Sequence, residues 1–185
     1  MSKSVETKRL ILREITYEDT EGLFELDSDA EVHRYLGKTP LSDMQQVKQI
    51  IDFIRQQYID YNIGRCAIID KNSNEFIGWC GLKYITEPTN GHINYYDLGY
   101  RLIPRFWGKG YASEAAKATL EYGFREMKLT EIFAIADCRN KKSDRVLKKL
   151  GFEITSKFVV ESMDHHWYQL NNDRYLDNFD TNLIG

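Results

Sequence analysis

The stretch that decides the fold is Arg105-Phe106-Trp107-Gly108-Lys109-Gly110-Tyr111-Ala112, where the period of the sequence changes. The residues before it, 93–103, alternate as a strand does, and Pro104 ends the run because it cannot donate to a sheet ladder. After it, small and apolar residues recur at helical spacing from Gly108 to about Met127. The pattern predicts a strand, a glycine-rich turn and a helix.

This turn has the features of an anion site. Gly108 and Gly110 allow a ligand to approach the backbone closely, and the first N–H groups of the helix have no intrahelical partner. Arg105 and Lys109 stand where an isolated helix would prefer acidic residues, an arrangement that a bound phosphate would offset. A glycine turn with two solvated basic residues is the alternative. The spacing fits neither a Walker loop nor the dinucleotide fingerprint.

The N-terminal half predicts one strand and three helices, followed by a hairpin. The strand covers residues 5–15, and short helices cover 18–26 and 30–36. A longer helix follows Pro40, with Ser42 as its N-cap and its end near residues 62–64. Strands at 66–70 and 75–84 are joined by a turn at 71–74, and residues 87–91 form a loop.

The C-terminal half predicts a strand at 131–137 and a helix at 140–150 that Gly151 terminates. Two strands follow within 152–175, joined by residues 161–164, and 176–185 form a polar tail. This order is an α+β arrangement: a mixed, mostly antiparallel sheet of about seven strands with helices on both faces. We expect a single domain over 1–185, with its core at about 7–175.

The composition excludes several classes of protein. The chain has 185 residues and a net charge of -3, and without a long Lys/Arg run it is not expected to bind nucleic acid directly. No apolar run reaches the roughly 18 residues of a spanning helix, and no signal peptide is present, so a cytoplasmic location is expected. Cys66, Cys80 and Cys138 are far apart, and the adjacent His165 and His166 point to opposite faces of a strand, which argues against a metal site.

Several segments together resemble one known family. The segment Trp107-Gly108-Lys109-Gly110-Tyr111-Ala112-x-Glu114-Ala115 resembles the cofactor loop of GNAT acetyltransferases, and most of all their RimJ/RimL branch, the ribosomal-protein N-terminal acetyltransferases. Asp97-Leu98-Gly99-Tyr100-Arg101-Leu102 is similar to the strand before that loop, and Asn140-x-x-Ser143-x-Arg145-Val146-Leu147-x-Lys149-Leu150-Gly151-Phe152 to the second cofactor motif. Residues 7–13 and 164–170 resemble the first and last strands.

The resemblance implies acetyl-CoA as co-substrate, with no metal. Its pantetheine arm would lie in a V-shaped split between the strands at 93–103 and 131–137, and its pyrophosphate would lie on the glycine-rich turn. Asn140, whose other role is that of a helix N-cap, would hydrogen-bond the arm. The cofactor-binding residues implied are Leu102, Ile103, Arg105, Trp107, Gly108, Lys109, Gly110, Tyr111, Ala112, Asn140 and Ser143.

The implied reaction is direct attack of a neutral amine on the thioester, which needs a proton acceptor and a proton donor. Some relatives carry a Tyr seven residues after the motif Asn, but Leu147 occupies that position here, so Ser143 is the candidate that protonates the sulfur. Asp97, acting through water, is the first candidate for the base, and Asp164 with His166 the second.

The acceptor side is less defined. Trp79, Tyr84, Tyr95 and Tyr100 are candidates for its lining, and the helices within 18–61 for its lid. Three hypotheses follow: acetylation of a protein N-terminal α-amine, acetylation of a small amine such as a polyamine, an antibiotic or an amino acid, and an acyl-CoA-binding module without catalysis. By the same resemblance a homodimer is common, although no sequence feature requires one.

Overall fold

The computed structural model describes residues 4–37 and 39–180. Eight strands form one sheet in the order β1-β2-β3-β4-β5-β6-β8-β7, and every neighbouring pair is antiparallel except β5 with β6. The strands are β1 (Val5–Glu6), β2 (Leu10–Glu14), β3 (Arg65–Asp70), β4 (Phe76–Ile85), β5 (Tyr95–Leu102), β6 (Glu131–Asp137), β7 (Glu153–Val160) and β8 (Met163–Asn171). The helices are α1 (Thr20–Asp27), α2 (Ala30–His33), α3 (Met44–Tyr61), α4 (Tyr111–Glu121), α5 (Lys141–Lys149) and α6 (Asn172–Asp180).

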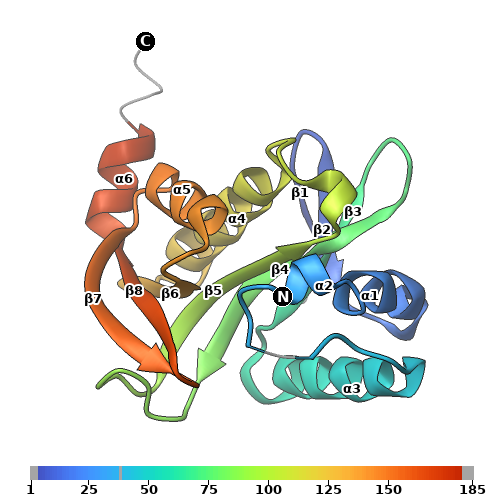
Figure 1. Cartoon of the computed structure of the whole chain (residues 1–185). Coiled ribbons are helices and arrows are strands. Elements are labelled where there is room, and N and C mark those ends of the chain that lie inside the picture. The colour runs from blue at the N-terminus through green and yellow to red at the C-terminus, as the bar shows by residue number, and fades with distance from the viewer. Residues whose placement is uncertain (1–3, 38, 181–185) are drawn as a thin grey trace.

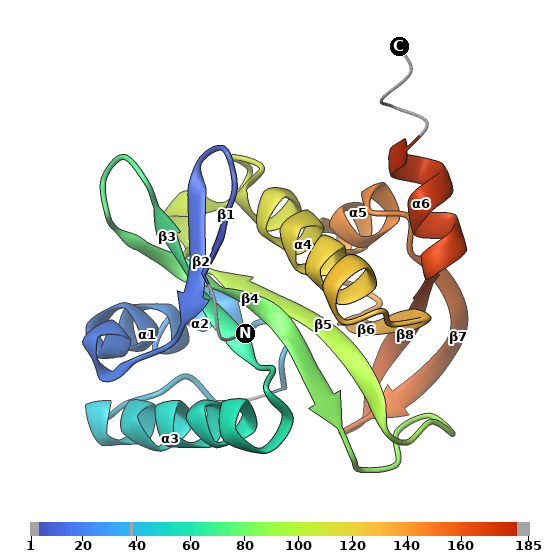
Figure 2. The same cartoon turned by 180° about the vertical axis from the view of Figure 1, so that it is seen from behind.

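The helices cover both faces of the sheet (Figures 1 and 2). On one face, α1 and α3 bury a cluster that includes Leu23, Ile51 and Ala67. On the other, α4 lies over the main core, to which it contributes Ala116 and Leu120. The α+β fold with a mixed, mostly antiparallel sheet is confirmed.

The N-cap of the long helix α3 lies one residue later than predicted. Asp43, and not Ser42, caps it, and Gln46 accepts a hydrogen bond from the Asp43 N–H in return. This reciprocal capping box satisfies two backbone N–H groups at the start of the helix. The helix ends at Asn62 in the left-handed conformation, as expected near residues 62–64.

Two other boundaries differ from prediction. The strand expected over 5–15 is the hairpin β1–β2, because the Thr7 hydroxyl accepts a hydrogen bond from the Leu10 N–H and turns the chain. This hairpin adds the eighth strand. The helix expected from Gly108 begins at Tyr111 and passes at Tyr122–Glu126 into a π-helical turn.

The polar tail expected at 176–185 is in part the helix α6, which starts at Asn172. The prediction failed because α6 has few apolar residues to show a period. One of them, Tyr175, is 2% exposed and packs its ring 4.9 Å from that of Phe124. Residues 181–185 lie outside the described residues. None of the described helices combines the length and apolar character needed to cross a membrane.

Candidate active site

The glycine-rich turn links the end of β5 to the start of α4. A single 3-10 turn, Pro104–Phe106, carries the chain out of the sheet. Gly108 and Gly110 then adopt φ angles of 75° and 83°, and Gly110 is the N-cap of α4. A residue with a side chain would be strained in this left-handed conformation, so the turn depends on glycine at both positions.

The N–H groups of this turn face no protein acceptor. Gly110 has no side chain to cap the helix, and no hydrogen bond from the N–H groups of residues 108–112 occurs among the residues that the structure describes. A Cβ added at Gly108 would meet nothing within 4 Å. The turn therefore presents a row of open donors at a positive helix end, which is how backbone binds phosphate.

The two basic residues of the turn differ in their surroundings. Arg105 contacts the carboxylate of Glu25 and lies 3.6 Å from that of Glu75, so its charge is partly neutralised. Lys109 has its ammonium 5.5 Å from the centre of the Phe106 ring and is exposed. Of the two, Lys109 has the freer charge for a phosphate.

A partly buried carboxylate, that of Glu114, holds the turn in place. Glu114, in the first turn of α4, accepts hydrogen bonds from the Thr7 hydroxyl at 2.6 Å and the Arg9 N–H at 2.9 Å, and it pairs with the Arg9 guanidinium at 2.6 Å. Burial alone would raise the pKa of Glu114, but these bonds hold it below its usual value. Arg9 also donates to the Lys109 carbonyl at 2.9 Å. The β1–β2 hairpin thus holds the helix start in place.

The parallel strands β5 and β6 share a short ladder. Their register contains one pair, Asp97 with Phe133, whereas β5 pairs with β4 along its whole length and β6 with β8 likewise. Past that pair the two strands have no partner on their facing edges among the described strands. This is the V-shaped split that the family resemblance implied, and the glycine-rich turn follows the end of β5.

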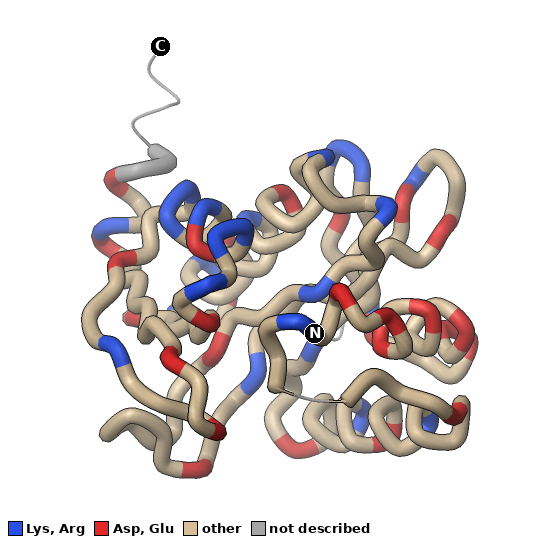
Figure 3. Tube along the Cα trace, in the orientation of Figure 1, with Lys and Arg blue, Asp and Glu red and all other residues tan. Residues whose placement is uncertain are grey.

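Trp107 closes one end of the split. Its indole N–H donates to the Leu102 carbonyl at 2.7 Å, and the Lys142 ammonium lies 4.3 Å from the centre of its ring. Leu102 and Ile103, expected to meet the cofactor through their backbone, are buried at this end of β5. Lys142 belongs to α5, along which Lys and Arg residues gather (Figure 3).

Asn140 and Ser143 occupy the first turn of α5. The Asn140 side-chain oxygen accepts from the Ser143 N–H at 3.1 Å, so Asn140 is the N-cap of α5. Its side-chain NH₂ has no hydrogen-bond partner among the described residues, which leaves a donor available to a ligand. Leu147 is 1% exposed in the main core, which makes it a packing residue.

Tyr100 reaches Ser143 from the strand side of the split. The two hydroxyl oxygens are 2.9 Å apart, and the Tyr100 hydroxyl also lies 3.3 Å from the Ser143 carbonyl. Burial raises the pKa of Tyr100 well above its usual range. The phenol therefore stays protonated, and its hydrogen bond with the Ser143 hydroxyl orients that group.

Asp97 lies at the vertex of the split, on the opposite face of β5 from Tyr100. Its carboxylate pairs with Arg65 of β3 at 2.6 Å, and burial raises the pKa of Asp97 while Arg65 opposes the rise. Arg65 crosses the sheet over Gly99, where an added Cβ would come within 2.6 Å of the guanidinium. Gly99 therefore makes the Arg65–Asp97 pair possible.

Trp79 and a second ion pair extend this face of the sheet. The guanidinium groups of Arg65 and Arg101 each lie 5.2 Å from a ring centre of Trp79. Arg101 also pairs with the buried Asp27 of α1. The face turned toward α1 and α3 is thus held by two ion pairs around one indole.

The remaining candidates fall elsewhere. Asp164 pairs with Lys157 at 2.7 Å, and His166 lies 3.4 Å from the Tyr168 hydroxyl, both on β8, beyond β6 from the Asp97 carboxylate. Tyr95 packs with Phe133 and Trp167 in a separate cluster. Within residues 4–37 and 39–180, no group of three or more His, Cys, Asp or Glu side chains could hold a metal ion.

Sequence reasoning missed three contributors: Arg65, Arg9 and the Tyr100–Ser143 contact. A glycine inside a strand signals that something approaches closely, so Gly99 was an indication of a long side chain crossing it. Arg9 lies in the segment 7–13 and Glu114 in the glycine-rich motif, but no local pattern shows that residues about a hundred positions apart meet. The Tyr100 hydroxyl partner depends on how α5 packs on the sheet.

Comparison with known proteins agrees with this geometry. A family model described as "Acetyltransferase (GNAT) domain" matches residues 9–153. The uncharacterized N-acetyltransferase p20 of Bacillus licheniformis is 36% identical over 147 residues, which cover 80% of each chain. The spermidine N(1)-acetyltransferase of Escherichia coli is 26% identical over 81% of this chain and 76% of its own. A GNAT-family acetyltransferase structure from Bacillus anthracis aligns with a TM-score of 0.77 and 26% identity, over 92% of this chain and 99% of that one.

The family model covers most of the chain, and p20 is similar across four fifths of it. GNAT acetyltransferases use acetyl-CoA, and the open amides and split strands described above are suited to that donor. The chain is an N-acetyltransferase that belongs to the GNAT family.

Proposed function

We propose that the chain transfers the acetyl group of acetyl-CoA directly to a primary amine held between the sheet and α3. The observation that carries this proposal is the run of open N–H groups at residues 108–112, which lies at the end of the split between β5 and β6. The donor's pyrophosphate accepts from these N–H groups, with Lys109 beside it. Asn140 donates from its side-chain NH₂ to the pantetheine arm.

If acetyl-CoA lies in the plane of the sheet, its thioester has one functional side chain of the protein on each side. Asp97 projects toward the α3 face, and Ser143 stands on the α5 face with its hydroxyl held by Tyr100. The amine therefore approaches from the side of Asp97, and the sulfur leaves toward Ser143. Because amine and thioester are held together, placement alone lowers the barrier by several kcal/mol.

The chemistry balances in one pass. The amine nitrogen forms a bond to the acetyl carbon as the carbon–sulfur bond breaks. Asp97 receives a proton from the nitrogen through water, and Ser143 passes its proton to the departing sulfur and regains one from solvent water. The raised pKa of Asp97 suits this role, because a base whose pKa lies closer to the working pH accepts a proton more readily. Arg65 keeps the carboxylate oriented.

Two acceptor classes fit this site. The RimJ/RimL resemblance suggests a protein N-terminal α-amine, whose pKa of about 7.7–8.0 leaves part of it neutral at pH 7. The alternative is a small amine, and the similarity to a spermidine acetyltransferase supports that class. A cytoplasmic location suits both classes.

The test offers the protein acetyl-CoA with each member of a panel of acceptors, and release of the free thiol measures turnover. The panel contains peptides that begin with Ala or Ser, alkyl amines and polyamines. We expect turnover with at least one class and the acetyl group on the amine nitrogen by mass spectrometry. Acetyl-CoA binding by calorimetry without transfer to any member would overturn the catalytic proposal.

A further inference from the structure

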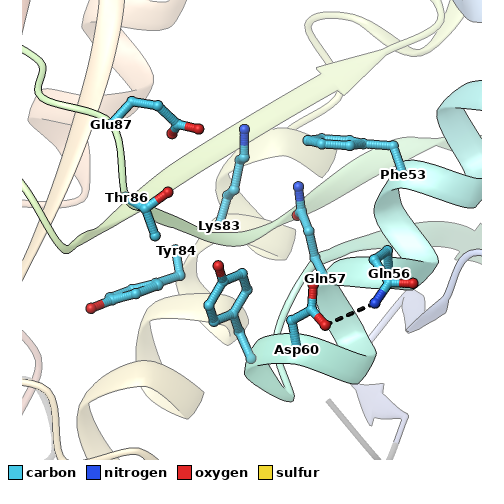
Figure 4. Close-up of a pocket in the computed structure, with 9 residues that line it drawn as sticks. Phe53, Gln56, Gln57, Asp60, Lys83, Tyr84, Thr86 and Glu87 are labelled. Atoms are coloured by element: carbon cyan, nitrogen blue, oxygen red, sulfur yellow. Dashed lines mark hydrogen bonds between the residues drawn. The ribbon is translucent and has the colours of Figure 1, made fainter.

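A pocket of about 140 Å³ opens on the α3 face, beside the vertex of the split (Figure 4). The last turns of α3 supply Gln57, Asp60 and Tyr61 to its wall. The end of β4 and the loop after it supply Tyr84 and Glu87. Of these five residues, only Tyr84 was already a candidate for the acceptor lining.

Gln57 is a buried polar side chain without its full set of partners. It is 7% exposed, and its side-chain oxygen has no hydrogen-bond partner among the described residues. Figure 4 shows its amide end reaching into the pocket beside Lys83. An unpaired buried acceptor costs about 1–3 kcal/mol, so this position favours a ligand that brings an N–H donor.

The carboxylates of the pocket have no cation of their own. Asp60 accepts a hydrogen bond from the neutral Gln56 side chain at 2.8 Å, and neither it nor Glu87 forms an ion pair with any described residue. Lys83, the one cation of the pocket wall, has its ammonium 5.1 Å from the centre of the Phe53 ring. Two negative charges against one positive leave the wall short of one positive charge.

Aromatic rings form the remaining side. The ring centres of Tyr61 and Tyr84 are 5.1 Å apart, and those of Tyr84 and Tyr96 are 5.0 Å apart. Ring faces attract ammonium groups, and the rings also cover the methylene carbons of an alkyl chain. Carboxylates, an amide oxygen and phenol rings are together suited to an alkyl ammonium group.

The pocket adjoins the proposed base. Lys83 is the direct register partner of Asp97 across the β4–β5 ladder, and the two side chains share a face of the sheet. A ligand that fills the pocket therefore has one part close to the Asp97 side chain. One end of that ligand can occupy the pocket while the other reaches the thioester.

We propose that this pocket binds a second ammonium group of the acceptor, so that the acceptor is a small alkyl diamine or polyamine. This inference rests on the proposed function, because it assumes that the reacting amine lies at Asp97. The ammonium donates to the Gln57 side-chain oxygen and is neutralised by Asp60 and Glu87. Of the two acceptor classes above, this pocket selects the small amines.

The decisive comparison uses two acceptors of equal chain length, diaminobutane and butylamine. In either acceptor one amine reacts at a time, and only diaminobutane then carries a second charge; its two equivalent amines account for no more than a doubling of the rate. We expect kcat/KM to favour diaminobutane about tenfold or more, in keeping with a hydrogen bond to a charged group. Calorimetry on the protein saturated with coenzyme A gives a readout that needs no turnover, and there diaminobutane should bind more tightly.

Three substitutions, two of them also combined, test whether the preference for diaminobutane arises in the pocket. Glu87→Gln and Asp60→Asn, both at exposed positions that do not threaten the fold, should each reduce the diamine preference about threefold to fivefold, and the double variant about tenfold. Gln57→Leu should reduce it about tenfold. Glu21→Gln, which removes an exposed carboxylate from α1 outside the pocket, is the matched control and should retain the full preference.

The outcomes separate the two proposals. If neither amine nor any peptide is acetylated, the proposed function fails, whereas diamine binding by calorimetry still tests the pocket. If butylamine and diaminobutane are used equally, or the preference survives in the Asp60/Glu87 double variant, the pocket proposal is wrong and the acetyltransferase proposal stands. Turnover of peptides without turnover of either amine would likewise contradict the pocket proposal and leave the acetyltransferase proposal standing.

Discussion

The two faces of the sheet build their halves of the site in different ways. On the α4–α5 face, the starts of two helices supply the binding groups: the open backbone N–H groups of residues 108–112 and the Asn140 side chain that caps α5. On the α1–α3 face, side chains from distant segments meet in pairs, Arg65 with Asp97 and Arg101 with Asp27. The donor half is therefore made by local conformation, and the acceptor half by tertiary packing.

The largest effect is expected from Gly110→Glu on the donor side. A side chain at φ 83° strains the turn, and its carboxylate repels a phosphate at the open amides. We expect acetyl-CoA affinity to fall at least about 100-fold, equivalent to roughly 2.7 kcal/mol. Calorimetry measures it.

Gly91→Glu is the matched control for this change. Gly91 has φ 78° and open space around it, so it carries the same backbone strain in a loop away from the turn. Equal loss of affinity in both variants would show that strain, and not the position of the turn, causes the effect.

On the acceptor side, Asp97→Asn should lower kcat about 100-fold, the usual contribution of a general base. Because burial raises the pKa of Asp97, the wild-type rate should fall as pH falls through that raised value, when the carboxylate gains its proton. The variant lacks this limb, and its residual rate should rise with pH as the amine itself loses its proton. A pH–rate profile measures both.

Asp164→Asn tests the second candidate for the base. Asp164 pairs with Lys157 and its side chain is 56% exposed, so its loss should leave the pH profile unchanged. If this variant lost the acid limb and Asp97→Asn retained it, the two assignments would be exchanged.

Ser143→Ala sharpens the contrast between the faces, since it removes a side-chain function from the half that is built at the starts of α4 and α5. The Asn140 cap bonds the Ser143 N–H, which alanine keeps, so acetyl-CoA affinity should hold while kcat falls about tenfold. Tyr100→Phe should lower kcat by less, because it only frees the hydroxyl to rotate. Ser42→Ala, at an exposed site before α3, controls for loss of a hydroxyl.

The smallest effect concerns stability. Glu114→Gln should cost about 1–2 kcal/mol at neutral pH, because the hydrogen bonds to a charged group weaken. The folded-state pKa of Glu114 is lowered, so its contribution is present above the unfolded pKa of about 4.3 and is lost as pH falls through the lower folded value. Denaturant titrations of the two proteins should therefore converge in acid.

Glu121→Gln is the control on the same helix. Glu121 forms an exposed pair with Arg125, and surface pairs of this kind contribute little. If the stability difference between wild type and Glu114→Gln stayed constant down to the lowest pH, the Glu114 carboxylate would not be what holds the start of α4 in place.

The contrast also explains how far the sequence could be interpreted. Strand and helix positions around residues 95–151 followed from period, glycine and proline, and the GNAT fold followed from the motifs there. For the Arg65–Asp97 pair, Gly99 indicated only that a long side chain crosses β5; it did not identify Arg65, which is 32 positions from Asp97 and meets it only through sheet register. The pocket beside Gln57 also depends on how α3 packs against β4, which no local pattern records.

Trp107 gives the protein an optical reporter of its own. Of the three tryptophans, Trp167 is 1% exposed in an aromatic cluster and Trp79 is covered by two arginines, whereas Trp107 is partly buried at the end of the split with the Lys142 ammonium against its ring. A donor that enters the split changes the polarity around that indole. Its fluorescence emission should therefore shift as the donor is titrated, which measures occupancy without a label.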